Sequence, residues 1–230
     1  MERAEGRRPE AMRPVRIKAK VNPYAEGSAL CCFGRTEVLC TASLEEGTPR
    51  WLEGEERGWV TAEYAMLPRS THTRTSRDHR TKGRAQEISR LIGRSLRAAV
   101  DLSALAGYTV KLDCDVMVAD GGTRTAGITG GYVALALALA KLGLAPLFPV
   151  AAVSCGKVEG QVVLDLCYEE DSNAEVDLNL VLAPGGRLVE VQSTAEQGFF
   201  SAGELGRMVA LGAEAAEGLF AAQAAAIGAA

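Results

Sequence analysis

The stretch Asp120-Gly121-Gly122-Thr123-Arg124-Thr125-Ala126-Gly127-Ile128-Thr129-Gly130-Gly131 joins two segments whose patterns predict regular structure. Before it, from Val110 to Val118, apolar residues alternate with mostly polar ones, which is typical of a strand with one buried face. After it, Tyr132–Ala140 is apolar on all sides, which predicts a helix inside the fold. The stretch is therefore a glycine-rich turn that leads from a strand into the N-terminus of a buried helix.

A turn of this composition favours an anion. Backbone amides at a helix N-terminus have no intrahelical acceptor, and the helix dipole is positive there. Gly121 and Gly122 let the backbone approach a ligand closely, and Arg124 offers a planar fork of donors to phosphate oxygens. No Gly-Lys-Ser/Thr follows at the spacing of a nucleotide-binding P-loop, so free phosphate suits the turn better than a triphosphate. The alternative is a structural turn in which Arg124 pairs with a neighbouring carboxylate.

Length and composition indicate a globular protein. The chain has 230 residues, of which 47% are apolar, enough for a full core in one large or two small domains. The six cysteines form no C-x-x-C pair and most lie in apolar runs, which predicts buried, reduced thiols. Residues 1–14 lack the apolar core of a signal peptide, and no run of about 18 apolar residues offers a membrane span. We expect a cytoplasmic protein with a flexible polar start over residues 1–14.

The remaining elements follow from periodicity and turn residues. The pattern predicts a strand over Val15–Val21 and a helix over Ile88–Val100, and a capping box, Ser201-x-x-Glu204, opens a last helix. The other predicted strands form hairpins or stand alone: Ser28–Phe33 with Thr36–Ser43, Trp59–Tyr64, Val150–Ser154 with Gln161–Leu166 across Gly156–Gly160, Val176–Leu182, and Arg187–Gln192.

The charge of the chain is unevenly distributed. The net charge is −4, yet residues 69–97 hold nine Lys or Arg against Asp78 and Glu87, a local net of +7. These basic residues lie in a loop with almost nothing apolar and on one face of the helix that follows it. A basic strip of this length suits a nucleic-acid backbone, and a solvated surface is the alternative. His72 and His79 have no partner at metal-ligand spacing, so we predict no metal site there.

Acidic residues gather in the last third of the chain. Six carboxylates occur within thirteen residues without one Lys or Arg among them: Asp165, Glu169, Glu170, Asp171, Glu175 and Asp177. Crowded carboxylates repel one another unless a cation neutralises them, and Mg²⁺ takes one or two carboxylates while keeping sites for substrate phosphates. A solvated acidic loop is the alternative. We call the glycine-rich turn at Asp120–Arg124 the phosphate turn. Together with this turn and the basic strip, the acidic cluster indicates phosphoryl transfer on a polynucleotide.

An ordered series of motifs resembles the ribonuclease PH family, the phosphate-dependent exoribonucleases that trim the 3′ ends of transfer RNA precursors. The resemblance spans nearly the whole chain. The stretches that carry it are Arg13-Pro14-Val15, Ala25–Ser28, Thr36–Ser43, Gly58–Tyr64, Met66–Arg74, Arg90–Arg94, Leu112–Val116, Ala119–Thr125, Tyr168–Ser172 and Glu190–Gln192.

The resemblance implies roles for particular residues. Asp171 and Asp177 match the catalytic acidic pair of the family, with a magnesium ion held near them. The residues that would bind the attacking phosphate are Arg84, Gly122, Thr123 and Arg124. The residues that match the basic loop holding transfer RNA are Arg69, Arg74 and Arg77.

The resemblance also implies the fold and the assembly. Residues 15–226 would form one ribonuclease PH domain, an α/β unit of the α+β type with mixed sheets packed against helices, like domain 2 of ribosomal protein S5. Six copies would form a homohexameric ring, a trimer of dimers. Gly127 stands where the family usually has serine, and the stretch between Lys141 and Val150 is shorter than usual. The first change could loosen the helix start, and the second could alter contacts between subunits.

Two other functions compete with phosphorolysis. The first is a hydrolytic, metal-dependent nuclease that uses the same acidic cluster with water as the nucleophile. The second is a catalytically silent RNA-binding ring subunit, as occurs among related exosome proteins. Such a subunit would be expected to lack the phosphate arginine or the acidic pair, whereas Arg124, Asp171 and Asp177 are all present.

Overall fold

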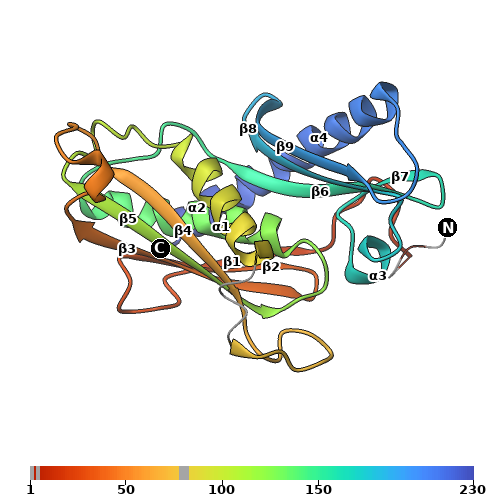
Figure 1. The fold of residues 1–230 in the computed structure, drawn as a ribbon, viewed down its shortest axis with the longest axis horizontal. Helices are drawn as coiled ribbons and strands as arrows, with labels where there is room; N and C mark the ends of the chain where they lie inside the picture. The colour runs from red at the N-terminus through yellow and green to blue at the C-terminus, as the bar shows by residue number, and fades with distance from the viewer. Residues whose placement is uncertain (1–2, 4–5, 78–82) are drawn as a thin grey trace.

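Two β-sheets form the framework of the molecule (Figure 1). The computed structural model describes Arg3, residues 6–77 and residues 83–230. Within these residues the first sheet has the strand order β1-β2-β3-β5-β4 and the second has the order β7-β6-β8-β9. The strands are β1 (Val15–Ala19), β2 (Gly27–Phe33), β3 (Thr36–Glu46), β4 (Trp59–Met66), β5 (Tyr108–Val118), β6 (Ala151–Val158), β7 (Gln161–Leu164), β8 (Val176–Ala183) and β9 (Arg187–Ala195).

The first sheet is mixed. Strands β1, β2, β3 and β5 pair antiparallel, whereas β4 runs parallel to β5 with Ala62 opposite Leu112. A parallel pair needs a crossover, and helix α1 (Gly83–Arg97) supplies it and packs against β4. These sheets, packed against helices, confirm the fold class expected from the sequence.

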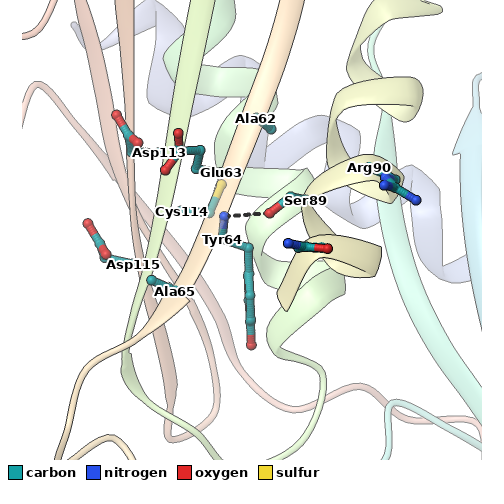
Figure 2. A pocket seen from close by; sticks show the side chains of 10 residues that line it. Ala62, Glu63, Tyr64, Ala65, Ser89, Arg90, Asp113, Cys114 and Asp115 are labelled. Carbon is teal, nitrogen blue, oxygen red and sulfur yellow. Dashed lines mark hydrogen bonds between the residues drawn. The ribbon is translucent and has the colours of Figure 1, made fainter. Parts of the chain in front are cut away.

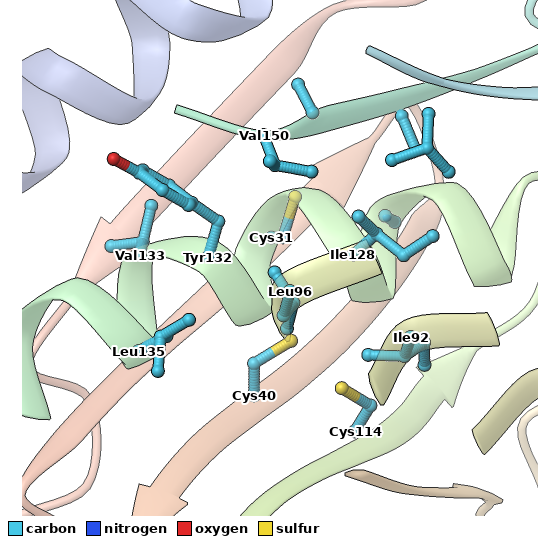
Figure 3. Close-up of a cluster of buried hydrophobic side chains, with 14 of the residues drawn as sticks. Cys31, Cys40, Ile92, Leu96, Cys114, Ile128, Tyr132, Val133, Leu135 and Val150 are labelled. Carbon is cyan, nitrogen blue, oxygen red and sulfur yellow. The ribbon is translucent and has the colours of Figure 1, made fainter. Parts of the chain in front are cut away.

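Helix α2 (Thr123–Lys141) lies between the two sheets. It contacts β2, β3 and β5 of the first sheet, and β6 and helix α4 on its other side. Figure 3 shows Cys31, Cys40 and Cys114 gathered around it with side chains of α1. Within the described residues all six cysteines are free and buried, as predicted, and burial raises the pKa of Cys155 to about 12. The helix without a polar face is therefore the centre of the common core.

Helix α4 (Ala202–Gly228) covers the second sheet and also contacts β1. It begins at the predicted capping box, where the Glu204 amide donates to Ser201 Oγ over 3.2 Å and the Ser201 amide donates to Glu204 Oε2 over 2.7 Å. No helix in the described part of the chain combines the length and apolarity that crossing a membrane requires.

Two boundaries next to predicted turns differ from the prediction. Helix α2 begins at Thr123, so the phosphate turn includes its first helical residues. Strand β6 continues to Val158, and a two-residue turn of Glu159 and Gly160, both with positive φ, replaces the longer turn predicted there. Gly156 lies inside strand β6. Only glycine fits at this position without a shift of its neighbours, because a Cβ there would come 2.6 Å from the Val176 carbonyl oxygen. The glycine therefore allows close packing and makes no turn.

The connection from α2 to β6 is short and tied to the core. Gly143 has a φ of 71°, and the Leu144 amide donates to the Leu139 carbonyl over 3.0 Å, which ends the helix. The Leu147 amide donates to the Ala99 carbonyl over 2.8 Å, which fixes the segment beside the end of α1. The shortened stretch therefore keeps both helices in place.

We expect Gly127→Ala to raise the free energy of unfolding by about 0.5–1 kcal/mol, because alanine loses less backbone entropy in a helix. A Cβ at Gly127 would lie 3.4 Å from Ile92 Cδ1 and 3.7 Å from Cys114 Cβ, which are ordinary contacts. Gly130→Ala is the matched control, since its Cβ would lie 2.6 Å from Cys31 Cβ and should cost about 1–3 kcal/mol. Urea unfolding of both variants measures the difference, and a loss of stability in Gly127→Ala would contradict this packing.

Candidate active site

A cavity of about 310 Å³ opens where the N-terminus of α2 meets β8 and the short helix α3 (Tyr168–Asp171). The cavity brings together every residue for which a phosphate-binding or catalytic role is predicted: Arg84, Gly122, Thr123, Arg124, Asp171 and Asp177. The other lining residues are Tyr64, Met66, Thr71, Ala119, Gly121, Ser154, Tyr168, Ser172 and Asn179. Residues far apart in the sequence therefore form one concave site.

The phosphate turn forms one wall. Gly121 and Gly122 have φ values of 75° and 68°, a region that glycine adopts without strain. A Cβ on Gly121 would lie 2.4 Å from the Leu166 carbonyl oxygen, so the turn packs directly on the loop before α3. The hydroxyls of Tyr64 and Thr123 are 2.8 Å apart and share a hydrogen bond. The first backbone hydrogen bond of the helix joins the Ala126 amide to the Gly122 carbonyl. The amides of the residues before Ala126 therefore have no acceptor within the helix.

The acidic pair forms the opposite wall. Asp171 ends α3 and Asp177 lies in β8, and both side chains are partly buried. Burial raises the pKa of each carboxyl, and the charge of Asp171 raises the pKa of Asp177 further. Arg124 acts in the opposite direction on both. The Asn179 amide donates to the two Asp177 oxygens over 3.1 and 3.2 Å, which fixes the plane of that carboxylate.

Two other carboxylates of the acidic cluster form buried ion pairs and do not line the cavity. Asp165 and Glu170 are buried, with exposed fractions of 0% and 4%, and they pair with arginines from the start of the chain. Hydrogen bonds from Arg3 and from the Cys167 amide outweigh burial and lower the pKa of Glu170 to about 2. The structure therefore divides the six carboxylates and leaves Asp171 and Asp177 as the pair that faces the cavity.

The arginines come from the segment expected to be flexible. Arg3 donates to Glu170 over 2.8 Å, Arg7 donates to Glu170 over 3.1 Å, and Arg13 reaches Asp165 over 2.7 Å. Arg3 and Arg13 are each 4% exposed. The prediction for residues 1–14, of which 1–2 and 4–5 lie outside the described residues, did not anticipate these contacts. Polar composition indicates exposure only where no buried partner of opposite charge exists.

Asp171 and Asp177 fit a magnesium ion. The described residues contain no group of three or more His, Cys, Asp or Glu side chains placed to bind one metal. Magnesium needs no such group, because it binds through one or two carboxylates and completes its shell with water and substrate oxygens. Burial raises the pKa of Asp177, and repulsion by Asp171 raises it further; a divalent cation would relieve that repulsion.

The predicted RNA-binding arginines lie outside the cavity. Arg69, Arg74 and Arg77 are exposed and none of them lines it, whereas Thr71 from the same loop does. The loop is anchored at its base, since the Ala119 amide donates to the Ser70 carbonyl over 2.8 Å directly before the phosphate turn. The basic residues His79, Arg80 and Lys82 lie outside the described residues. The loop therefore starts beside the cavity and carries its charges into solvent.

A second cavity of about 470 Å³ lies at the edge of the first sheet, between α1 and strands β4 and β5 (Figure 2). Asp113 and Asp115 line it and point away from α1 in Figure 2. Ser89 Oγ of α1 accepts a hydrogen bond from the Tyr64 amide over 2.9 Å, which covers the open edge of β4. None of the predicted site residues lines this cavity. The hydrogen bond from Tyr64 to α1 nevertheless fixes strand β4 at the residue whose hydroxyl contacts Thr123.

Several residues that line the 310 Å³ cavity were assigned no role from the sequence. Tyr64 has the pattern of a core residue, and only its hydroxyl, 2.8 Å from Thr123 Oγ1, reaches the site. Tyr168 lies in one of the family motifs but was assigned no role, and Ser154 gave no signal in the sequence. Asn179 was available, because strand alternation places it on the same face as Asp177.

Family comparisons define the class. The model described as "3′ exoribonuclease family, domain 1" matches residues 11–141, and the model of domain 2 of the same family matches residues 149–215. Together the two models cover most of the chain, so the fold is that of the 3′ exoribonuclease family. A "Ribonuclease PH" from Bdellovibrio bacteriovorus is 53% identical over 234 residues, covering 98% of this chain and 96% of that protein. Another from Saccharopolyspora erythraea is 55% identical over 220 residues, covering 91% and 88%.

The chain belongs to the ribonuclease PH family. It is therefore a phosphorolytic 3′ exoribonuclease and a nucleotidyltransferase, which confirms the enzyme class expected from the sequence. A solved structure of the Archaeoglobus fulgidus exosome with RNA bound to its active site shares the fold, with a TM-score of 0.81, 22% identity, and coverage of 95% of this chain and 91% of that one.

Proposed function

We propose that the cavity between the phosphate turn and the acidic pair is the active site, and that it trims the 3′ ends of transfer RNA precursors. The observation that carries the proposal is the meeting of two opposite charge sets in one cavity. Arg84 and Arg124 suit an anionic nucleophile, and Asp171 and Asp177 suit a metal ion and a proton. Neither set alone would distinguish phosphorolysis from hydrolysis.

The reaction replaces a phosphodiester bond with a phosphoanhydride bond. Phosphate held by Arg84, Arg124 and the turn amides attacks the phosphorus of the last phosphodiester. A bond forms between phosphorus and the phosphate oxygen, and the bond to the 3′ oxygen of the preceding nucleotide breaks. The terminal nucleotide leaves as a nucleoside diphosphate. Because the diphosphate carries the new phosphoanhydride bond, which can be attacked in turn by the 3′ hydroxyl, abundant diphosphate would drive the reaction backwards and extend the RNA.

The leaving 3′ oxygen needs a proton, and Asp177 is the group we assign to supply it. Its carboxyl has a raised pKa, which increases the protonated fraction near neutral pH. Asn179 keeps the carboxylate in one plane. When bound by Asp171 and Asp177, Mg²⁺ would offset negative charge on the phosphoryl oxygens.

The proposal extends to assembly and location. We propose a homohexameric ring built as a trimer of dimers, in the cytoplasm, where transfer RNA precursors are present in bacteria. Several large apolar side chains are more than half exposed in the single chain and would be covered by subunit contacts: Tyr24, Trp51, Leu147 and Phe199.

The identity of the released nucleotide tests the chemistry. Purified protein is incubated with RNA in buffer with and without inorganic phosphate, and the products are separated by anion exchange. Nucleoside diphosphates that appear only with phosphate support phosphorolysis at this site. Monophosphates released without phosphate would establish hydrolysis, and RNA binding without any release would establish a silent ring subunit.

We expect Asp177→Asn to lower kcat by about 100-fold or more in both trimming and extension, because it removes the proton donor and a metal ligand with little change in volume. RNA affinity should change little. Glu169→Gln is the matched control, since Glu169 is exposed on α3 and does not line the cavity. Single-turnover rates on an end-labelled RNA measure both variants, and near-normal turnover of Asp177→Asn would remove the acidic pair from the mechanism.

Arg124→Lys should raise the phosphate concentration needed for half-maximal rate by about tenfold, because a lysine ammonium cannot replace the planar fork of the guanidinium. The same substitution at Arg187, an exposed residue of β9, serves as the control. Initial rates over a phosphate series at saturating RNA give the result. An unchanged requirement in Arg124→Lys would place the anion elsewhere.

Replacing Arg69, Arg74 and Arg77 with glutamine should weaken binding of a transfer RNA precursor while leaving turnover of a short single-stranded RNA nearly unchanged. Each lost phosphate contact removes counterion release, so the plot of log affinity against log salt should flatten by about 0.7–0.9 per contact. A control triple variant of exposed residues that do not line the cavity loses the same charge: Lys18, Lys141 and Arg207. Equal loss of both activities would place the loop in the catalytic centre or in ring assembly.

A further inference from the structure

Arg13 is a buried cation that the proposed reaction does not use. Its side chain is 4% exposed and lies directly beneath the phosphate turn. We infer that Arg13 is a positioning residue: it fixes the peptide groups of the turn so that their amides point at the attacking phosphate. This inference rests on the proposed phosphate site, and it adds a residue that does not contact the phosphate.

Asp165 binds one edge of the Arg13 guanidinium. Nε donates to Asp165 Oδ2 over 2.9 Å and Nη2 donates to Oδ1 over 2.7 Å, a bidentate pair, and the Arg13 amide donates to Oδ2 over 2.8 Å. Asp165 is fully buried and has a φ of 53°, a conformation that aspartate tolerates only at a cost. Its own amide donates to the Ser154 carbonyl over 2.7 Å. The orientation of Arg13 is therefore fixed from one side by a rigid group.

The remaining donors of Arg13 hold the turn. Nη1 donates to the Asp120 carbonyl, and Nη2 lies 3.4 Å from the Gly121 carbonyl oxygen. A Cβ on Gly122 would lie 3.1 Å from Nη2, so a side chain there would require the guanidinium to shift by a few tenths of an ångström. Thr36 completes the support, because its hydroxyl donates to the Gly121 carbonyl over 2.6 Å and accepts from the Asp120 amide over 2.9 Å.

These contacts determine where the amides point. A trans peptide is planar, with its carbonyl and its N–H directed to opposite sides. Arg13 holds the Asp120 and Gly121 carbonyls, and it thereby turns the amides of Gly121 and Gly122 away from itself. Gly121 and Gly122 both line the cavity. Two consecutive glycines have wide conformational freedom, so the donors are preorganised only if another group holds their carbonyls.

Lysine at position 13 separates this role from simple stability. Arg13→Lys keeps a positive charge opposite Asp165, but one ammonium cannot maintain the bidentate pair and also reach two carbonyls. We expect the phosphate concentration for half-maximal rate to rise about tenfold, as for the loss of one charge-assisted hydrogen bond. The KM for RNA and kcat at saturating phosphate should stay within about twofold.

The control is Arg97→Lys, which alters another partly buried arginine far from the turn. Arg97 donates to the Val60 carbonyl over 2.7 Å and lies over the Trp59 ring, and it does not line the cavity. We expect this variant to lower the melting temperature without moving the phosphate requirement. All rates are measured well below the melting temperature of each variant.

A second pair of variants decides the question if Arg13→Lys does not fold. Thr36→Val removes the hydroxyl that holds Asp120 and Gly121 without changing the shape of the side chain, and Thr36→Ser retains it. We expect Thr36→Val to raise the phosphate requirement about threefold or more, and Thr36→Ser to restore it. A general loss of packing would not distinguish these two variants in this way.

The outcomes separate this inference from the proposed function. A raised phosphate requirement in Arg13→Lys, or in Thr36→Val with recovery in Thr36→Ser, supports positioning. If Arg124→Lys raises the requirement while the position 13 and position 36 variants leave it unchanged, the inference is wrong and the phosphate site stands. If Arg124→Lys also leaves it unchanged, the phosphate site itself is wrong and the inference fails with it.

Discussion

Helix α2 has no polar face, and this constraint determines the rest of the structure. A helix apolar on all sides is stable in water only when other elements enclose it, and here two sheets and the helices α1 and α4 do so. Its N-terminus cannot be satisfied by bulk solvent in the way that a surface helix is. The glycine turn before it therefore meets the loop after β7, and residues of this turn and of the first helical turn line a cavity of about 310 Å³. The enclosure of the helix thus creates the cavity in which we propose the anion site.

Enclosure brings charges into the interior, and the N-terminal arginines compensate them. Asp165 and Glu170 would be costly to bury alone, because a charge removed from water needs a partner and hydrogen bonds. Arg3, Arg7 and Arg13 provide both, and Glu170 accepts from the Cys167 amide at the start of α3. Asp171 follows Glu170 directly, so the pairs that stabilise the fold also place one member of the proposed catalytic pair.

The sequence predicts what depends on local pattern. Alternation and turn residues gave most strands, and composition gave α2, since both reflect a single buried face or none. The sequence does not predict pairing over long distances. The acidic cluster contains no Lys or Arg, which suggested that a metal ion neutralises it, whereas the arginines that pair with Asp165 and Glu170 lie more than 150 positions earlier. The same limitation hid Tyr64, because its burial predicts packing and says nothing about where its hydroxyl points. Gly156 was misassigned to a turn because close strand packing and turns both favour glycine.

The two walls of the cavity are linked through their charges. Arg124 and Arg84 lower the pKa values of Asp171 and Asp177, while burial raises them. An anion bound at these arginines neutralises the charges that favour the carboxylates, so binding of the nucleophile shifts the acidic pair toward its protonated form. A divalent cation at the pair acts in the opposite direction. The state of the proton donor therefore depends on which substrates are bound, and a phosphate site separated from the acidic pair would lack this coupling. The shared cavity, more than any single residue, is what suits the structure to phosphorolysis.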